Sequence, residues 1–157
     1  MKNKRKIFEN IAIYIAIFMA VSSIILTREI GDLDEIWNYN FANCITKGLV
    51  PYRDFNIVIT PLLPIIEGII LKILPNELII MRILAVILAS SILFMLYKIL
   101  QTLKTNKSLN ILAVLTIGYL LKNYYCIDYN FFVLFLTLII IYLEMKKIMN
   151  RSRTTFT

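Results

Sequence analysis

The sequence contains no histidine, two cysteines and few charged side chains among its 157 residues. Transition-metal sites draw mainly on histidine and cysteine, so this composition argues against such a site. Carboxylate oxygens could still bind a hard divalent cation. Cys44 and Cys126 could pair in an oxidising compartment, but two cysteines do not establish a disulfide, and we expect both to be free.

Charge is scarce and apolar content is high. Charged residues make up 17% of the chain and hydrophobic residues 59%, whereas soluble domains average about 25% charged and about 45–50% apolar residues. The surplus apolar surface therefore requires lipid. The net charge of +7 comes from short basic clusters beside apolar runs, a placement that orients membrane helices. We expect an integral membrane protein with the lipid bilayer as partner and no nucleic-acid partner.

The basic N-terminus, Met1 to Lys6, precedes an apolar run from Ile7 to Leu26. A secretory signal peptide is the alternative reading of this segment. Its apolar core would be about 7–15 residues long and end at a small-residue cleavage site. This run is longer and is followed by Thr27-Arg28-Glu29, so we predict an uncleaved first span.

Loop charge decides how many apolar segments cross the membrane. The apolar segments are residues 7–26, 61–74, 78–100, 109–121 and 131–143. A span needs about 20 residues, and the second segment is short and contains Pro61, Pro64 and Glu67. If all five crossed, the later basic clusters would lie opposite the N-terminal one, against the positive-inside rule. If residues 61–74 stay outside, every basic cluster is cytoplasmic.

We therefore predict an all-α membrane protein with about four transmembrane helices and juxtamembrane helices in a long first outer loop. The whole chain, 1–157, forms a single membrane domain. Its predicted spans are 7–26, 77–100, 109–122 and 129–146, and its outer loop, 27–76, carries juxtamembrane helices at 33–47 and 61–74. Both termini are expected in the cytoplasm. Richness in Ile, Lys and Asn indicates an AT-rich bacterial genome, hence a bacterial plasma membrane.

The first juxtamembrane helix has its own signals. Apolar residues recur at helical spacing and predict an amphipathic helix lying in the membrane interface: Leu33, Ile36, Trp37, Phe41, Cys44 and Ile45. Trp37 and Tyr39 suit the headgroup level. Asp32 is a candidate N-cap with Glu35 three residues later, as in a capping box. Gly48 fits the position just past the helix end.

Some charged residues could carry chemistry. Asp34 and Glu35 are adjacent carboxylates that could act as a general base or bind a divalent ion, but spacing alone favours helix capping. Arg82 lies near the start of an apolar run; it either marks a functional site that could pair with a phosphate or snorkels to the interface.

Two further acidic residues have ordinary readings. Asp128 lies in a short outer turn, residues 123–130, where a polar turn within an aromatic belt is the favoured reading. Glu67 could be buried and functional, but we expect it to be solvated at the interface.

Three stretches resemble the first outer loop of polytopic glycosyltransferases with the GT-C fold. They are Asp34-Glu35-Ile36-Trp37-Asn38-Tyr39, Lys47-Gly48-Leu49-Val50-Pro51-Tyr52-Arg53-Asp54-Phe55 and Pro61-Leu62-Leu63. The nearest branch is the dolichyl-phosphate-mannose protein mannosyltransferase and aminoarabinose transferase group, and the likeness covers roughly residues 7 to 143. Thr60 departs from the Pro-Pro-Leu pattern of that group, and its members run to several hundred residues with many more spans.

The resemblance implies roles for individual residues. Asp34 matches the catalytic base, and Glu35 is its neighbour, which helps to position an acceptor or an ion. Arg53 and Asp54 match the substrate-binding segment of the loop. Arg82 and Asp128 fall at the places of an arginine-bearing span and of a second outer acidic residue, and both count as substrate-binding candidates.

The implied activity is sugar transfer from a polyprenyl-phosphate donor to an unknown acceptor on the extracytoplasmic face, with this chain forming the N-terminal portion of such an enzyme. No cofactor is expected, with a divalent cation as an open alternative. The alternative is a non-catalytic small membrane protein, either an accessory subunit or a truncated remnant of such an enzyme. A transporter is disfavoured because the spans show few midplane polar groups or broken helices.

Overall fold

The computed structural model describes residues 2–29 and 33–154, which form helices and no strand. The six helices are α1 (Lys2–Ile25), α2 (Leu33–Thr46), α3 (Leu62–Ile73), α4 (Leu78–Thr102), α5 (Lys107–Leu120) and α6 (Tyr129–Thr154). The predicted all-α class is therefore confirmed for the part of the chain described. The predicted N-cap, Asp32, lies outside the described residues.

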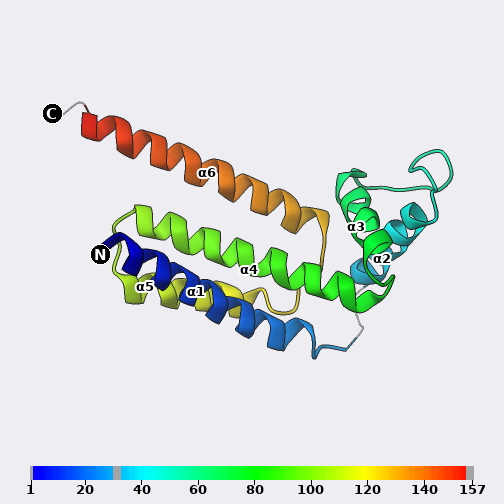
Figure 1. Cartoon of the computed structure of the whole chain (residues 1–157), viewed down its shortest axis with the longest axis horizontal. Helices are drawn as coiled ribbons and strands as arrows, with labels where there is room; N and C mark the ends of the chain where they lie inside the picture. The colour runs from blue at the N-terminus through cyan, green and yellow to red at the C-terminus, as the bar shows by residue number, and fades with distance from the viewer. Residues whose placement is uncertain (1, 30–32, 155–157) are drawn as a thin grey trace.

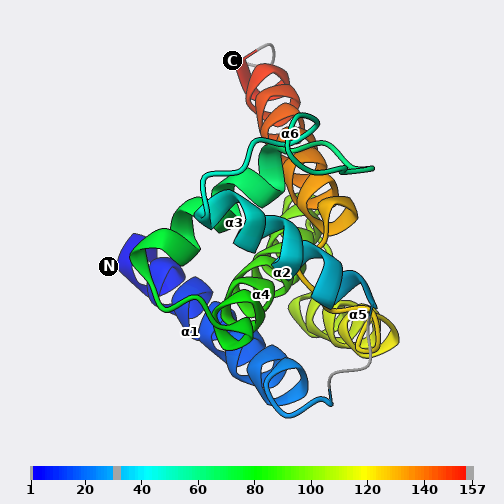
Figure 2. The same ribbon diagram turned by 90° about the vertical axis from the view of Figure 1, so that its right-hand side faces the viewer.

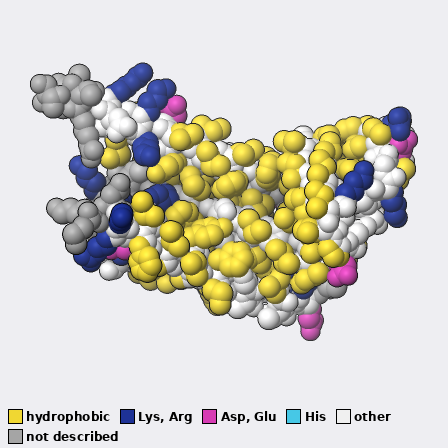
Figure 3. Space-filling model, in the orientation of Figure 1, with side chains coloured by type: hydrophobic (Ala, Val, Ile, Leu, Met, Phe, Trp, Pro, Cys, Tyr) yellow, Lys and Arg dark blue, Asp and Glu magenta, His cyan; other side chains and the backbone are white. Residues whose placement is uncertain are grey.

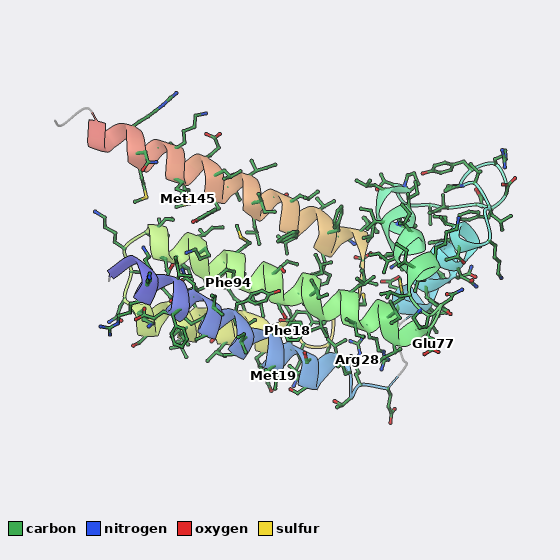
Figure 4. The ribbon with its side chains drawn as sticks, in the orientation of Figure 1. Phe18, Met19, Arg28, Glu77, Phe94 and Met145 are labelled. Atoms are coloured by element: carbon green, nitrogen blue, oxygen red, sulfur yellow. The ribbon has the colours of Figure 1, made fainter. Side chains whose placement is uncertain are left out.

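Helix α4 is the centre of the molecule. Figures 1 and 2 show α1, α5 and α6 arranged around it, while α2 and α3 lie together at one end. Its buried side chains include Met81, Ala85, Val86, Ala89, Ile92, Leu93 and Tyr97. Phe94 extends this packing to α1, where its ring meets that of Tyr14 edge-on at 5.3 Å between centroids (Figure 4).

Among the residues that the structure describes, two helices are long and apolar enough to cross a membrane, α1 and α4. They coincide with the predicted spans 7–26 and 77–100. The predicted span 109–122 corresponds to α5, a shorter apolar helix of 14 residues, and the predicted span 129–146 lies inside α6. Most of the apolar stretch of α1 is exposed. Figure 3 shows hydrophobic side chains covering the middle of the elongated molecule.

The two predicted juxtamembrane helices are present as α2 and α3, with ends within two residues of the predicted ones. Gly48 follows α2 with φ +81°, a conformation that favours glycine. Its amide donates to the Ile45 carbonyl at 3.0 Å, which confirms the predicted helix stop. A side chain on Gly68 of α3 would come within 2.7 Å of Ile45, so glycine permits the close packing of α3 on α2.

Helix α2 turns two polar side chains, Glu35 and Asn38, inward. Glu35, Asn38 and Ala42 are buried, whereas Leu33 and Trp37 are exposed. The exposed apolar face is the one expected to contact the membrane interface. The two buried polar side chains connect α2 to α4 and to the chain before α6.

Candidate functional site

A polar cavity of about 200 Å³ lies where α2, the loop after it and the start of α6 meet. Its lining residues are Asp34, Trp37, Asn38, Phe41, Val58, Ile59, Asp128, Tyr129 and Asn130. The structure thus places Asp34 and Asp128, which are far apart in sequence, on one cavity. The other predicted site residues do not line it.

Asn38 fixes the position of α2 relative to the start of α6. Its side-chain amide donates to the Asp34 carbonyl and to the Ile127 carbonyl, each at 2.9 Å. The first carbonyl belongs to Asp34, and the second belongs to Ile127, the residue before Asp128. The buried side-chain amide of Asn38 therefore joins the two walls of the cavity that carry these acids. Sequence analysis missed Asn38, although its place one helical turn after Asp34 gives a signal for a shared face.

Asp128 immediately precedes helix α6. Its carboxylate accepts from the Asn130 amide N–H at 3.2 Å and from the Asn130 side chain at 2.8 Å, and its carbonyl accepts from the Phe132 amide at 3.0 Å. This is the behaviour of an N-cap residue. Asp128 is 8% exposed, and the three residues before it are also buried. The expected polar turn is therefore only partly exposed: residues 125–128 are packed inside, whereas Tyr124 and Tyr129 are exposed. Asn130 is a second cavity residue that sequence analysis missed.

Arg53 and Asp54 form an exposed ion pair of 2.8 Å in the loop between α2 and α3. The Asp54 carboxylate also accepts from the Val50 amide at 2.8 Å. The hydrogen bond from Arg53, and then that from Val50, lower the pKa of Asp54 to about 2. These contacts close a turn rather than line the cavity. The same loop supplies Val58 to the cavity wall.

The rest of this loop is anchored to α2 and to itself. The Tyr52 hydroxyl donates to the Ile59 carbonyl at 2.9 Å, and the Phe41 and Phe55 rings stack with centroids 6.1 Å apart. Phe41 and Ile59 both line the cavity. Arg53 and Asp54 therefore contribute to the site through the shape of the loop.

Glu35 and Arg82 form a buried ion pair away from the cavity. Arg82 Nε donates to Glu35 Oε1 at 2.6 Å and Arg82 Nη2 to Oε2 at 3.2 Å. Glu35 is 3% exposed and Arg82 9%. Arg82 Nη1 also donates to the Arg28 carbonyl at 2.7 Å. Arg82 is thus buried and does not extend to the interface. Its guanidinium binds Glu35 and the Arg28 carbonyl instead of facing a phosphate site, and the Glu35 carboxylate is bound to Arg82.

Arg28 is a second cation at this pair that sequence analysis missed. Its guanidinium lies 3.9 Å from Glu35 Oε2 and donates to the Asn123 carbonyl at 3.1 Å. Figure 4 shows Arg28 just beyond α1, at the end of the molecule that carries α2. Arg28 therefore ties the chain after α1 to α2 and to the segment after α5.

The burial of Glu67 differs from what we expected. We expected a solvated carboxylate, but Glu67 is 0% exposed, and neither oxygen has a hydrogen-bond partner within the described part of the chain. Burial, and then the negative charge of Asp128, raise the pKa of Glu67 to about 8. Ionisation in an apolar site is unfavourable, so this carboxyl is protonated at neutral pH. Cys44 and Cys126 form no disulfide with each other.

Comparisons with protein-family models, with curated proteins and with solved structures each found no match. The arguments for function therefore rest on the residues of this chain.

Removing Arg82 should destabilise the protein strongly. Arg82→Gln leaves the buried Glu35 carboxylate without its main partner, so we expect a loss of about 3–5 kcal/mol in the free energy of unfolding. The double variant Glu35→Gln/Arg82→Gln should recover part of this loss because no uncompensated charge remains. Arg53→Gln breaks an exposed pair and should cost less than about 1 kcal/mol. Denaturant unfolding in detergent micelles measures all three; equal losses for Arg82→Gln and Arg53→Gln would contradict the assignment.

Glu67 should make stability fall as pH rises. Its folded-state pKa of about 8 lies above the ordinary value of 4.5, so between these pH values only the unfolded state releases the proton. The free energy of unfolding should then decrease by up to about 1.4 kcal/mol per pH unit. Glu67→Gln should remove this component, whereas the exposed Glu77→Gln should follow the wild type. Unfolding measured from pH 4.5 to 8 tests this, and parallel curves for wild type and Glu67→Gln would refute it.

Proposed function

We propose that this chain forms part of a membrane glycosyltransferase that transfers a sugar from a polyprenyl-phosphate donor to an acceptor on the extracytoplasmic face. The observation that carries the proposal is the polar cavity that holds both Asp34 and Asp128. Asp34 precedes Asp128 in the sequence, which is the order of the two acidic residues in the GT-C enzymes that the chain resembles. A carboxylate beside a cavity can take a proton from an acceptor hydroxyl when the hydroxyl comes within reach.

In the proposed reaction, the acceptor oxygen forms a bond to the anomeric carbon of the sugar. The bond from this carbon to the phosphate oxygen breaks, the lipid phosphate leaves with the bonding electrons, and Asp34 receives the acceptor proton. In this proposal, Asp128 orients the sugar or the acceptor, and Asn38 holds the cavity wall that carries Asp34. The buried Arg82 is not assigned to the leaving phosphate, because Glu35 already occupies it.

The proposed topology has four spans, with both termini in the cytoplasm of a bacterial cell. Figure 1 supports it: the two ends of the chain and the α4–α5 connection lie at one end, and α2 and α3 lie at the other. An ion pair of 3.5 Å between Glu9 of α1 and Lys107 of α5 joins the two helix starts. The basic clusters of these segments then share one side, as the positive-inside rule requires.

A non-catalytic role is the second candidate, and the cavity size favours it. Ligand pockets usually measure about 300–1,000 Å³, and this cavity of about 200 Å³ has room for one sugar-sized group. An accessory subunit that packs against a larger membrane partner would need no larger cavity. The same holds for a remnant of an enzyme. Absence of sugar transfer by the wild-type chain with every polyprenyl-phosphate sugar tested would select this candidate.

Asp34→Asn should abolish sugar transfer, because the amide cannot accept the acceptor proton. The assay follows product formation by the purified chain in detergent with polyprenyl-phosphate sugars and candidate acceptors. Glu77→Gln is the control, since Glu77 is exposed and lies outside the cavity, and it should retain activity. Circular dichroism should show equal helix content for both variants. Normal transfer by Asp34→Asn would exclude Asp34 as the base.

Cysteine labelling should place residues 54 and 104 on opposite sides of the membrane. In a background with Cys44 and Cys126 replaced by serine, Asp54→Cys should react with a membrane-impermeant maleimide added to intact spheroplasts. Lys104→Cys should react only after the membrane is permeabilised. Labelling of both positions from the same side would refute the four-span topology and, with it, the outer-face reaction.

A further inference from the structure

Three lysines from three different helices meet at the end of the molecule opposite α2 and α3. They are Lys6 of α1, Lys98 of α4 and Lys146 of α6, and we call them the lysine cluster. The Lys6 and Lys146 ammonium groups each repel that of Lys98. Figure 3 shows Lys and Arg side chains gathered at this end. Lys6 and Lys146 are exposed and Lys98 is partly exposed, so a ligand can reach all three.

Contacts between α1 and α4 place Lys6 and Lys98 at the same level. The Tyr14 hydroxyl of α1 lies 3.5 Å from the Ser91 hydroxyl of α4, and the two helices run in opposite directions (Figure 1). Lys6 is about two helical turns before Tyr14. Lys98 is about two turns after Ser91. The two lysines are therefore displaced from this contact in the same direction and by similar amounts.

A contact between α4 and α6 places Lys146 at this level as well. The Thr102 hydroxyl near the end of α4 lies 3.9 Å from the Met145 sulfur of α6. Lys146 is the next residue after Met145, and Lys98 is about one turn before Thr102. The lysine cluster is thus a product of helix packing, because its members are far apart in the sequence.

No acidic side chain neutralises the lysine cluster. None of its members takes part in an ion pair in the described part of the chain. Lys98 donates to the neutral Gln101 side chain at 3.2 Å, and the Lys146 ammonium lies 5.6 Å from the centre of the Tyr142 ring. Each ammonium group has three donors, so these contacts leave donors unused.

The acids at the same end are bound elsewhere. Glu9 pairs with Arg5 and Lys107, at 3.3 and 3.5 Å, and Glu144 pairs with Lys147 at 3.5 Å. Like charges held close together destabilise one another. A bound anion would offset this repulsion, so the charge of the cluster selects an anionic ligand.

The apolar surface beside the cluster indicates a lipid rather than a free anion. Lys98 continues a stripe of α4 that contains Ile87, Ser91 and Phe94, at intervals of three or four residues. Ile87 is 43% exposed, and Ser91 and Phe94 are partly exposed. The stripe is flanked by α1, where Phe94 meets the Tyr14 ring, and by α6, which shares a cavity with Ile87 and Ser91. A phospholipid has the same order of groups, with acyl chains next to a phosphate.

We propose that the lysine cluster binds the phosphate of an anionic phospholipid whose acyl chains lie along this stripe of α4. Hydrogen bonds from ammonium groups to phosphate oxygens are charge-assisted and therefore strong. Basic pockets between membrane helices bind anionic lipid headgroups in this way. A zwitterionic lipid is disfavoured, because its own cation would meet the lysines. The proposal requires α1 and α4 to cross the membrane and is independent of sugar transfer.

Native mass spectrometry of the whole chain in detergent tests the proposal. Phosphatidylglycerol and phosphatidylcholine with the same acyl chains are added in equal amounts. Wild type should retain phosphatidylglycerol about tenfold more than phosphatidylcholine, and Lys98→Gln/Lys146→Gln should retain the two lipids equally. Lys4→Gln/Lys104→Gln is the matched control: it removes two exposed charges at the same end but outside the cluster, and it should behave like wild type.

A charge-preserving variant keeps the test informative if the glutamine variant alters folding. Lys98→Arg/Lys146→Arg should remain selective for phosphatidylglycerol, and an excess of inorganic phosphate should not displace the bound lipid. Equal loss of selectivity in the two glutamine variants would overturn the proposal, because the charge of the whole end would then attract the lipid. Displacement by inorganic phosphate, loss of selectivity in the arginine variant or equal retention of both lipids by wild type would also overturn it.

Discussion

The buried ion pair between Arg82 and Glu35 is the interaction on which the arrangement of α2 relative to α4 depends. It joins the start of α4 to the inward face of α2, and the Arg28 carbonyl completes the coordination of the guanidinium. A buried pair is weak evidence for stability in itself, because desolvation offsets its attraction. Its geometry nevertheless fixes the orientation of α2, since any rotation of α2 would leave two buried charges unpaired.

That orientation has a direct effect on the polar cavity. With Glu35 directed toward α4, Asp34 is directed elsewhere on α2, and Asn38 reaches the chain just before α6. The adjacent acids Asp34 and Glu35 thus have separate roles, one at the cavity and one in the support behind it. Of the two neighbouring carboxylates, Glu35 is paired with Arg82 and Asp34 lines the cavity.

Local signals in the sequence predicted the helices well, and contacts distant in sequence were the main source of error. Apolar run length located α1 and α4, and Gly48 marked the end of α2, because these features depend on nearby residues. The partner of Arg82 lies 47 positions earlier, and no local pattern reveals it. The burial of Glu67 was missed for the same reason: α4 and α6 cover it. Asp34 and Asp128 were placed at one site through a family resemblance rather than through physical periodicity.

The position of Trp37 has a practical consequence. It is the single tryptophan of the chain, it lines the polar cavity, and its side chain is 53% exposed. Indole emission shifts with the polarity of its surroundings, so tryptophan fluorescence of the unmodified protein reports on the surroundings of Trp37. Any molecule that enters beside Asp34, or any lipid that covers α2, would change that emission without an attached dye.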